Sequence, residues 1–561
     1  MSFKAVTARC VAVAAFLFFL SARHSPAAQF YNDWATSHFS DLPSQAGWTN
    51  DPDGDGEINL VEFAFGTDPR MADGLGGAMT PQFGSPSGTN GTFVVQILER
   101  NGHAPGVQID LYLSKNLKDW IRPWWFRMLT NSLPGDPVGS VRESFTTQLA
   151  GTNMWFVRSA VTLIEAGPEA ANYYVATNGS DSNNGTAINT PFATLAKAVG
   201  LANPGNLIYV RDGLYNFSAQ VTLSRSGSPT NPIRVRAYPG EHPAFDFSTE
   251  PSGSAGIRIQ GDCWQVYGLE VIHSGHNGVL INGNSNLVER CVIHESGDTG
   301  LHITSNGGTQ LAGFNLVLNC DSYRNYDPGA TGGNADGFTA KFIVGQSNIF
   351  RGCRSWNNSD DGWDFWRATN AILVDHCLTF SNGFNVFGVP VFSGDGNGFK
   401  MGGDYQAGPH HYIDCVSFGN RVNGFDQNNN TAGLTVDNCT SFTNGGANFS
   451  MNHDSTNAPM VGFHVVRNSL SIAGHSADSF RTGALLTNNS WQVVSPAPAP
   501  AELLSIAGGY ALGARRDDGS LPETPLMRPI PGSRLVNRGT NIGNTFFGTA
   551  PDLGAYETPE W

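Results

Sequence analysis

The feature that most constrains this chain is a short line of sequence that recurs through its second half. Five copies carry an asparagine five residues after a cysteine; they read NCDSYRN, GCRSWNN, HCLTFSN, DCVSFGN and NCTSFTN, and they begin at residues 319, 352, 376, 414 and 438. A weaker copy, RCVIHES, begins at residue 290. The cysteines from Cys291 to Cys439 are 29, 33, 24, 38 and 24 residues apart. A period of about 24 residues with insertions is the signature of a solenoid, and short apolar runs between Gly and Asn turns favour a β-solenoid.

The repeat also predicts what lies inside the solenoid. One coil cannot bury its own apolar face, so coils stack and identical positions form ladders. We expect the asparagines of the five copies to bond to one another and to the backbone in the turns. Of eight cysteines, Cys10 lies near the N-terminus and the other seven fall at similar points of the repeat. This placement indicates small apolar core residues, and a disulfide between neighbouring coils stays open.

The N-terminus reads as a signal peptide over residues 1–28. Lys4 and Arg9 precede the apolar run CVAVAAFLFFL, and small residues follow this run, in the order that export signals have. The run is too short to span a bilayer comfortably, and no second apolar stretch of spanning length follows. We therefore expect an exported protein, extracellular or periplasmic, with no membrane insertion after cleavage. An uncleaved anchor is the alternative.

The next segment, residues 29–76, contains a motif for a metal ion. Residues 51–62, DPDGDGEINLVE, match an EF-hand loop, with carboxylates at loop positions 1, 3 and 5, Gly at 6 and Glu at 12. A single loop is typical of a structural clip rather than a sensor, and an acidic solvated turn is the alternative. The expected Ca²⁺ ligands are the oxygens of Asp51, Asp53, Asp55, Asn59 and Glu62.

Three further segments complete the domain organisation. Residues 77–164 alternate apolar stretches with Gly, Asn and Pro clusters, which predicts a small Ig-like β-sandwich. Residues 165–171 read as a linker, and residues 172–561 as the solenoid with a C-terminal extension. The predicted fold class is therefore all-β: a parallel β-helix preceded by a small β-sandwich and an EF-hand-like calcium loop.

The charge of the chain limits its partners. Lys and Arg number 32 against 47 Asp and Glu, which gives a net charge of −15. Proteins that bind nucleic acid are usually basic, so no nucleic-acid partner is expected. An acidic chain does not attract a polyanion over long range. An anionic substrate would therefore be held locally, by a metal ion and a few basic side chains. The chain is expected to be a monomer.

A second recurring line, a polar residue followed by Gly and an apolar residue, aligns the coils with one another. The position before this Gly holds Asn277, Thr299, Asp336, Asp361, Asn397 and Asn423. The second position after it holds Leu280, His302, Thr339, Asp364, Lys400 and Asp426. Because neighbouring coils lie about 4.8 Å apart, Asp361 should stack on Asp336. Lys400 should likewise stack on Asp364, with Asp360 at the same turn.

The aspartates of these columns are candidate metal ligands. Four carboxylates in two adjacent coils would repel one another strongly if left bare, and like charges stacked directly opposite are destabilising. A cluster of hard oxygen ligands points to Ca²⁺. The predicted ligands are Asp336, Asp360, Asp361 and Asp364, and a set of solvated turn aspartates is the alternative.

Lys400 is the candidate base. A lysine accepts a proton only when it is neutral, and its ordinary pKa is about 10.4. Bound Ca²⁺ disfavours the ammonium form, whereas bare Asp364 would favour it. Metal binding would thus anchor an anionic substrate and make the base usable. The expected reaction is β-elimination on a uronate, whose acidic C5 proton lies next to its carboxylate, with activity rising into alkaline pH. A surface lysine paired with Asp364 is the alternative.

Three motifs carry a family resemblance. NADGFTAKF, NSDDGWDFW and GNGFKMGG, beginning at residues 334, 358 and 396, resemble polysaccharide lyase family nine, and the resemblance covers residues 172–489. It implies a right-handed parallel β-helix with the four aspartates on Ca²⁺ and Lys400 as the base. The family includes pectate lyases and rhamnogalacturonan lyases. The substrate implied is an acidic plant cell-wall polysaccharide, polygalacturonate, with rhamnogalacturonan as the alternative.

Two other kinds of function stay open. Polygalacturonases are hydrolases that resemble this chain in fold, and the SDD at residues 359–361 fits them loosely, but the sequence has no Gly-His-Gly or Arg-Ile-Lys line. A non-catalytic adhesin or sugar-binding solenoid would leave the Asp–Lys arrangement unexplained. Lys341, Arg367 and His410 are candidate substrate-binding residues only because they lie close to the motifs in sequence, and they are not assigned to the site.

Overall fold

The structure is a computed structural model. It describes residues 169–307, 311–452, 459–516, 518–544 and 546–558, and before them six strands and a few single positions. The predicted signal peptide lies outside the described residues, and so does the EF-hand-like loop apart from Pro52. The chain divides into two compact units, one of residues 170–511 and 526–558 and the other of residues 1–169, 512–525 and 559–561. Among the described residues, no helix combines the length and apolarity that a membrane span needs.

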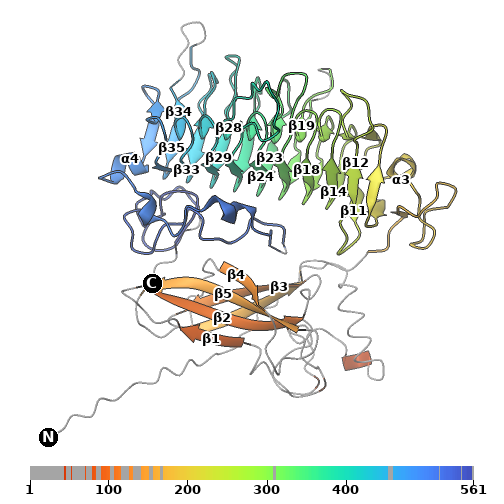
Figure 1. The fold of residues 1–561 in the computed structure, drawn as a ribbon, viewed down its shortest axis with the longest axis horizontal. Coiled ribbons are helices and arrows are strands. Elements are labelled where there is room, and N and C mark those ends of the chain that lie inside the picture. Colours follow the sequence, from red (N-terminus) through yellow and green to blue (C-terminus); the bar gives the residue numbers. More distant parts are fainter. Residues whose placement is uncertain are drawn as a thin grey trace. The chain divides into compact units, whose positions relative to one another are not determined.

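The strands of the N-terminal unit are antiparallel (Figure 1, orange). One sheet has the order β1-β2-β5-β4, and β3 pairs with β6 in a second sheet. Their bounds are β1 Met79–Phe83, β2 Asn90–Arg100, β3 Val107–Ser114, β4 Phe126–Thr130, β5 Ser140–Ala150 and β6 Phe156–Leu163; a short 3-10 helix, η1, spans Pro43–Gln45. The Ig-like assignment and the domain boundaries stay predictions.

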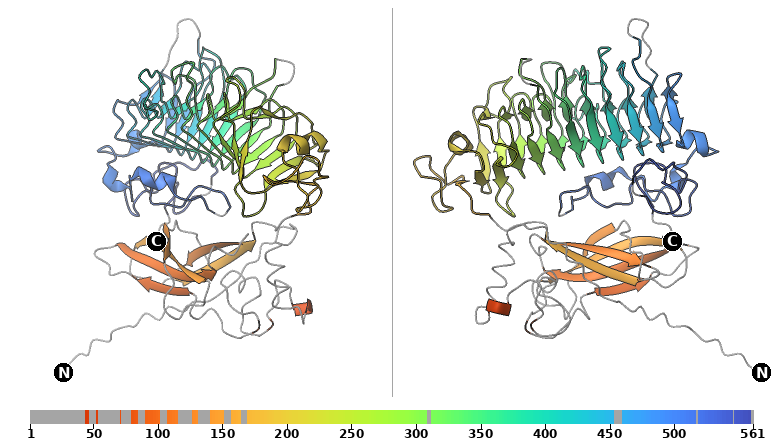
Figure 2. Two further views of the ribbon diagram at one scale, coloured as in Figure 1. Left: turned by 45° about the vertical axis from the view of Figure 1, so that its right-hand side comes forward. Right: turned by 180° about the vertical axis from the view of Figure 1, so that it is seen from behind.

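The larger unit winds through three parallel sheets, as Figures 1 and 2 show. Sheet 1 is made of β10 Val221–Leu223, β13 Ile257–Ile259, β16 Val279–Ile281, β19 Leu301–Ile303, β22 Phe338–Ala340, β25 Trp363–Asp364, β28 Phe399–Lys400, β31 Phe425–Asp426, β34 Phe449–Met451 and β37 Ser479–Phe480. Each strand pairs with the strand one coil further on, so the predicted parallel β-helix is confirmed.

Sheets 2 and 3 form the other walls of the solenoid. Sheet 2 is made of β7 Tyr173–Val175, β8 Leu207–Val210, β11 Ile233–Ala237, β14 Trp264–Tyr267, β17 Leu287–Glu289, β20 Leu316–Leu318, β23 Asn348–Arg351, β26 Ile372–Asp375, β29 His411–Ile413, β32 Thr435–Asp437, β35 Val465–Arg467 and β38 Leu485–Thr487. Sheet 3 is made of β9 Leu214–Asn216, β12 Ala244–Asp246, β15 Glu270–Ile272, β18 Val292–His294, β21 Asp321–Tyr323, β24 Arg354–Trp356, β27 Leu378–Phe380, β30 Val416–Phe418, β33 Thr440–Phe442 and β36 Leu470–Ile472.

Short helices and a C-terminal segment accompany the ends of the solenoid. Helix α3 (Leu195–Leu201) begins after Thr194, whose hydroxyl accepts a hydrogen bond from the Lys197 N–H at 3.2 Å. The remaining helices are α4 Ser490–Val493, η3 Pro500–Glu502 and η4 Gly508–Leu512. The C-terminal segment packs on the coils, since the Ala555 N–H donates to the Thr440 hydroxyl at 2.9 Å.

The predicted ladders fill the interior. Each ladder amide donates to the amide oxygen one coil further on: Asn325 to Asn358 at 2.8 Å, Asn358 to Asn382 at 3.0 Å, Asn382 to Asn420 at 2.9 Å and Asn420 to Asn444 at 3.0 Å. The seven cysteines from Cys263 to Cys439 are buried with free thiols, as core residues should be. A second ladder was not predicted: the Asn315 amide donates to Asn348 at 3.1 Å, and the Asn286 N–H donates to Asn315 at 3.0 Å.

Candidate active site

Sheet 1 brings the predicted site residues together. Thr339 pairs with Asp364, Asp364 with Lys400, and Lys400 with Asp426, so the predicted column is confirmed. Asp336 lies two residues before β22, and Asp360 and Asp361 lie three and two residues before β25. The four aspartates and Lys400 therefore meet on one outer face of the solenoid, across three successive coils.

The inner side of the same strands fixes this placement. A buried stack of aromatic rings continues from coil to coil, with centroid separations of 4.9–5.1 Å; it consists of Phe338, Trp363, Phe399, Phe425 and Phe449. The repeated glycine leaves room for a neighbouring strand, because a Cβ on Gly362 would lie 2.0 Å from the Thr379 hydroxyl. Since side chains alternate along a strand, burying the aromatic ring turns the next residue, Asp364 or Lys400, outward.

Backbone N–H groups hold the carboxylates of the cluster in place. Each aspartate accepts at Oδ1: Asp336 from the Asp361 N–H at 3.0 Å, Asp360 from the Asp395 N–H at 2.6 Å, Asp361 from the Asn397 N–H at 2.6 Å, and Asp364 from the Trp366 N–H at 2.8 Å. The second oxygens of Asp336, Asp361 and Asp364 face the ammonium groups of the cluster. The Oδ2 of Asp361 is buried and accepts no hydrogen bond from the described residues.

Two ammonium groups enter this cluster. Lys400 Nζ lies 3.1 Å from Asp361 Oδ2, 3.6 Å from Asp364 Oδ2 and 3.5 Å from Asp395 Oδ2. Lys341 Nζ lies 2.6 Å from Asp336 Oδ2 and 2.9 Å from the same Asp364 oxygen. Both lysine side chains are 12–13% exposed, and Asp395 is 65% exposed, so Asp395 alone of these partners faces solvent.

The proximity of these charges shifts their pKa values. Burial, with repulsion from neighbouring carboxylates, raises the pKa of Asp336 to about 8 and that of Asp361 to about 6. Burial alone would also raise the pKa of Asp364, but Lys341 and Lys400 outweigh it and hold that pKa below its ordinary value. Burial opposes the charged form of Lys400, yet the aspartates outweigh it and raise the pKa of Lys400. The bare cluster thus favours protonation of Asp336 and Asp361 and of Lys400, whereas a bound cation would favour the ionised carboxylates.

The donor set fits a hard divalent cation. One carboxylate oxygen from each of Asp336, Asp360 and Asp361 lies within 4.8 Å of the others. Clustered carboxylate oxygens are the ligands that Ca²⁺ sites use. The assignment of these residues as metal ligands, and of Lys400 as the base, stays a prediction.

Sequence reasoning missed the place of Lys341. It follows the last residue of β22, where the coil leaves sheet 1, so the column alignment did not reach it. A lysine five residues after Asp336 was the available signal. Arg367 is exposed and pairs with Asp404 at 3.2 Å. His410 is buried in the core, where burial lowers its pKa to about 3, so it does not face the cluster.

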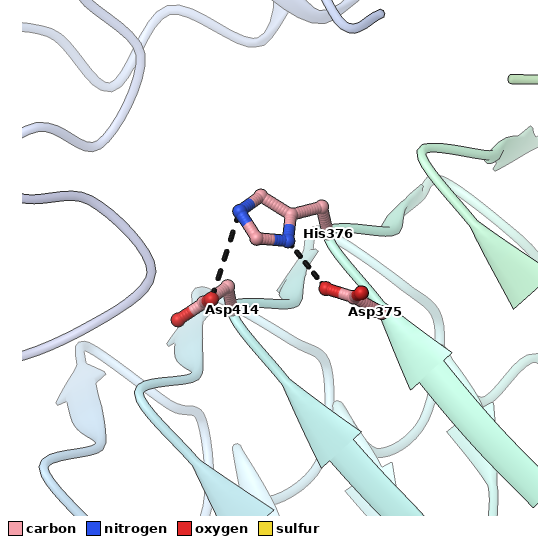
Figure 3. A group of neighbouring side chains, drawn as sticks. All are labelled: Asp375, His376 and Asp414. Atoms are coloured by element: carbon pink, nitrogen blue, oxygen red, sulfur yellow. Dashed lines mark hydrogen bonds and ion pairs between the residues drawn. The ribbon is translucent and has the colours of Figure 1, made fainter. Parts of the chain in front are cut away.

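A second group of metal-competent side chains lies on the turn between sheets 2 and 3. Figure 3 shows His376 between the carboxylates of Asp375 and Asp414. These charges already have protein partners: Arg351 Nε lies 2.6 Å from Asp375, and the Asn438 amide donates to Asp414 at 3.0 Å. We read this group as an ion-pair ladder that continues the stacking of the coils.

Fold and site together define a class, a parallel β-helix with a buried carboxylate–lysine cluster on one outer face. The family model described as "Pel9A-like, right handed beta helix region" matches residues 173–468. The chain belongs to this Pel9A-like right-handed β-helix family. The predicted resemblance to polysaccharide lyase family nine is confirmed.

The chain is similar to curated relatives and to solved structures over most of its length. Pectate lyase L of Dickeya chrysanthemi is 40% identical over 69% of this chain and 90% of its own length. Pectate lyase L of Paenibacillus polymyxa is 35% identical over 67% of this chain and 85% of its own. The crystal structure of pectate lyase Pel9A is similar with a TM-score of 0.63 and 36% identity, covering 69% of this chain and 96% of that one. A rhamnogalacturonan lyase is similar with a TM-score of 0.57 and 28% identity, covering 64% and 96%.

Proposed function

We propose that this chain is a Ca²⁺-dependent lyase that cleaves polygalacturonate by β-elimination, with Lys400 as the base. Membership of the family makes the chain a polysaccharide lyase. The observation that carries the mechanism is the contact of Lys400 Nζ with Asp361 and Asp364 at 3.1 and 3.6 Å. A base beside a metal-competent carboxylate cluster is what proton abstraction next to a uronate carboxylate requires.

The aspartates and Lys400 have different roles in this mechanism: the aspartates bind the metal, and Lys400 transfers a proton. Asp336, Asp360, Asp361 and Asp364 would hold Ca²⁺, which when bound neutralises the substrate carboxylate and stabilises the enolate-like charge next to it. Lys400 takes the C5 proton. The electron pair of that C–H bond forms the C4–C5 double bond as the bond from C4 to O4 breaks. The departing oxygen takes a proton from solvent, and Lys400 releases the C5 proton to solvent. No water is consumed.

The cluster also explains why Lys400 would need bound Ca²⁺ in order to act as a base. In the bare cluster the aspartates keep the pKa of Lys400 raised, so the amine holds its proton. Neutralising Asp361 and Asp364 removes the charges that favour the ammonium form. Turnover should therefore be lost in chelator and rise into alkaline pH when Ca²⁺ is present.

The comparisons favour polygalacturonate over rhamnogalacturonan. Relatives that the chain covers to 85–90% are named pectate lyases. Among structures, identity to the pectate lyase is 36% against 28% for the rhamnogalacturonan lyase. A rhamnogalacturonan lyase with the same mechanism is the second candidate, because the same five residues would serve either backbone.

Lys400→Ala tests the mechanism. The wild type and the variant are assayed on polygalacturonate and on rhamnogalacturonan, in Ca²⁺ and in chelator, by the ultraviolet absorbance of the unsaturated product. We expect wild-type absorbance to rise only with Ca²⁺, and Lys400→Ala to lose about a hundred- to ten-thousandfold in kcat, as removal of a general base does. Lys197→Ala, at an exposed position of α3, is the matched control and should keep wild-type rates.

Each contrary outcome has its own meaning. Full activity of Lys400→Ala would refute the role of Lys400, and a wild type active in chelator would refute the role of the metal. Chain cleavage without new absorbance would identify a hydrolase. Binding without any cleavage would identify the sugar-binding solenoid.

The remaining sequence predictions are part of the same proposal. They comprise export by the signal peptide at residues 1–28, a monomeric enzyme, and a second Ca²⁺ in the loop at residues 51–62. An acidic plant cell-wall polysaccharide as partner fits an exported lyase of this kind.

A further inference from the structure

Lys341 lies inside the carboxylate cluster, but it has no role in the proposed mechanism. Its Nζ contacts Asp336 and Asp364 at 2.6 and 2.9 Å, and these two carboxylates come from neighbouring coils. Asp336 is fully buried and the Asp364 side chain is 3% exposed. A solvent-exposed lysine pair contributes little and is loosely held, but removal of one partner from a buried pair leaves an uncompensated charge. Lys341 is therefore a built part of the site.

A charge count shows what Lys341 does in the bare cluster. When all four carboxylates are ionised, Asp336, Asp360, Asp361 and Asp364 carry four negative charges against the two ammonium groups of Lys341 and Lys400. Two negative charges remain, which one divalent cation would balance. Asp336 belongs both to the three metal-competent carboxylates and to the contacts of Lys341. A metal ion and Lys341 would thus share one carboxylate.

We propose that Lys341 is the resident counter-ion of the carboxylate cluster, and that a divalent cation binds in competition with its ammonium group for Asp336. This inference rests on the proposed metal site. In the metal-free protein Lys341 offsets the repulsion among the aspartates and stabilises the fold around them. When the metal enters, the same positive charge opposes it and weakens its affinity. Lys341 is a positioning residue, because it acts through Asp336 and Asp364.

Calcium titration of the full-length Lys341→Met variant tests this proposal without an activity readout. Calorimetry measures the Kd for Ca²⁺ after both proteins are stripped of metal. We expect the Kd of the cluster site to fall by about tenfold or more, since a nearby positive charge has been removed. In chelator, the unfolding midpoint of Lys341→Met should drop below that of the wild type, and saturating Ca²⁺ should narrow this gap.

Three further variants separate charge from other effects. Asp361→Asn identifies which binding event belongs to the cluster, because the EF-hand-like loop is expected to bind Ca²⁺ as well. Lys341→Arg keeps the charge and should bind Ca²⁺ with an affinity close to that of the wild type. Lys197→Met makes the same charge change on the exposed surface of α3 and should alter neither readout.

The outcomes separate this proposal from the one it rests on. Unchanged or weaker Ca²⁺ binding by Lys341→Met overturns the counter-ion role, and weaker binding would show that Lys341 orients the carboxylates for the metal. Absence of any binding event that Asp361→Asn removes would overturn the metal site and the counter-ion role together. Should Lys341→Met fail to fold, Lys341→Gln prepared in saturating Ca²⁺ gives the same comparison.

Discussion

Buried charge in this molecule is compensated at some residues and left bare at others. In the cluster, every aspartate accepts a backbone hydrogen bond and two lysines supply positive charge. Glu250 has less support: it is 8% exposed, one oxygen accepts the Gly275 N–H at 2.7 Å, and the other accepts no hydrogen bond from the residues that the structure describes. Burial outweighs that single hydrogen bond and raises the pKa of Glu250 to about 7. Glu250 should therefore make folding stability depend on pH.

Glu250→Gln is expected to stabilise the protein at pH 8. Because the folded-state pKa lies above the unfolded value, the stabilising contribution of Glu250 is complete below pH of about 4.5 and is lost as pH rises through about 7. A neutral amide does not carry the cost of a buried carboxylate. We expect a gain in the free energy of unfolding on the order of 1 kcal/mol at pH 8 and no gain at pH 4.5, measured by urea unfolding.

Glu270→Gln supplies a control of opposite sign. The hydrogen bond from His294, at 3.0 Å, outweighs burial and lowers the pKa of Glu270. This carboxylate stabilises the fold above its unfolded pKa, so its replacement should bring no gain at pH 8. Equal stabilisation by both variants would mean that loss of net negative charge, and not the burial of Glu250, is the cause.

At the scale of one element, the asparagine ladder shows how the coils are locked in register. Each ladder asparagine bonds to the coil before it and to the coil after it. Asn382 accepts from the Asn358 amide at 3.0 Å and donates to Asn420 at 2.9 Å, and all three side chains are buried. Asn358 and Asn382 lie in the turns that lead into the strands of Asp364 and Lys400. The ladder therefore supports the site as well as the fold.

Asn382→Ala should destabilise the solenoid by about 2–3 kcal/mol, because the Asn358 amide and the Asn420 oxygen would be left buried with fewer partners. The shift of the urea unfolding midpoint measures this. Asn189→Ala, at an exposed turn position, is the control and should leave the midpoint in place. Equal midpoints for the two variants would show that the ladder follows the stacking of the coils without stabilising it.

These elements also show how far sequence predicts structure here. The register of sheet 1 could be predicted because each coil carries one glycine at the same position. The glycine is needed there because a Cβ would clash with a Ser or Thr hydroxyl, as at Gly362. The second ladder carried a signal that was not used: Asn286, Asn315 and Asn348 each lie five residues before a repeat cysteine. Lys341 could not be placed from the columns, because it sits where the coil bends away from the sheet and side-chain reach, not register, decides its contacts.

The whole molecule is acidic, and its proposed substrate is a polyanion. With a net charge of −15, long-range repulsion should slow the encounter, and binding should depend on the few cations at the cluster. Salt screens exposed charges over a Debye length of about 10 Å at 0.1 M, whereas contacts inside a buried cluster are screened less. Moderate salt should therefore relieve the repulsion before it weakens the contacts at the site.

We accordingly expect kcat/KM on polygalacturonate to rise when NaCl is increased from about 10 to about 100 mM at fixed free Ca²⁺, because the repulsion acts on the encounter rate. The rise should be larger for long chains than for a short galacturonate oligomer, which carries fewer charges. Initial rates of product absorbance at low substrate concentration measure both. A fall in kcat/KM over the same range would mean that local positive charge already steers the substrate to the site, and that the net charge of the chain has little influence there.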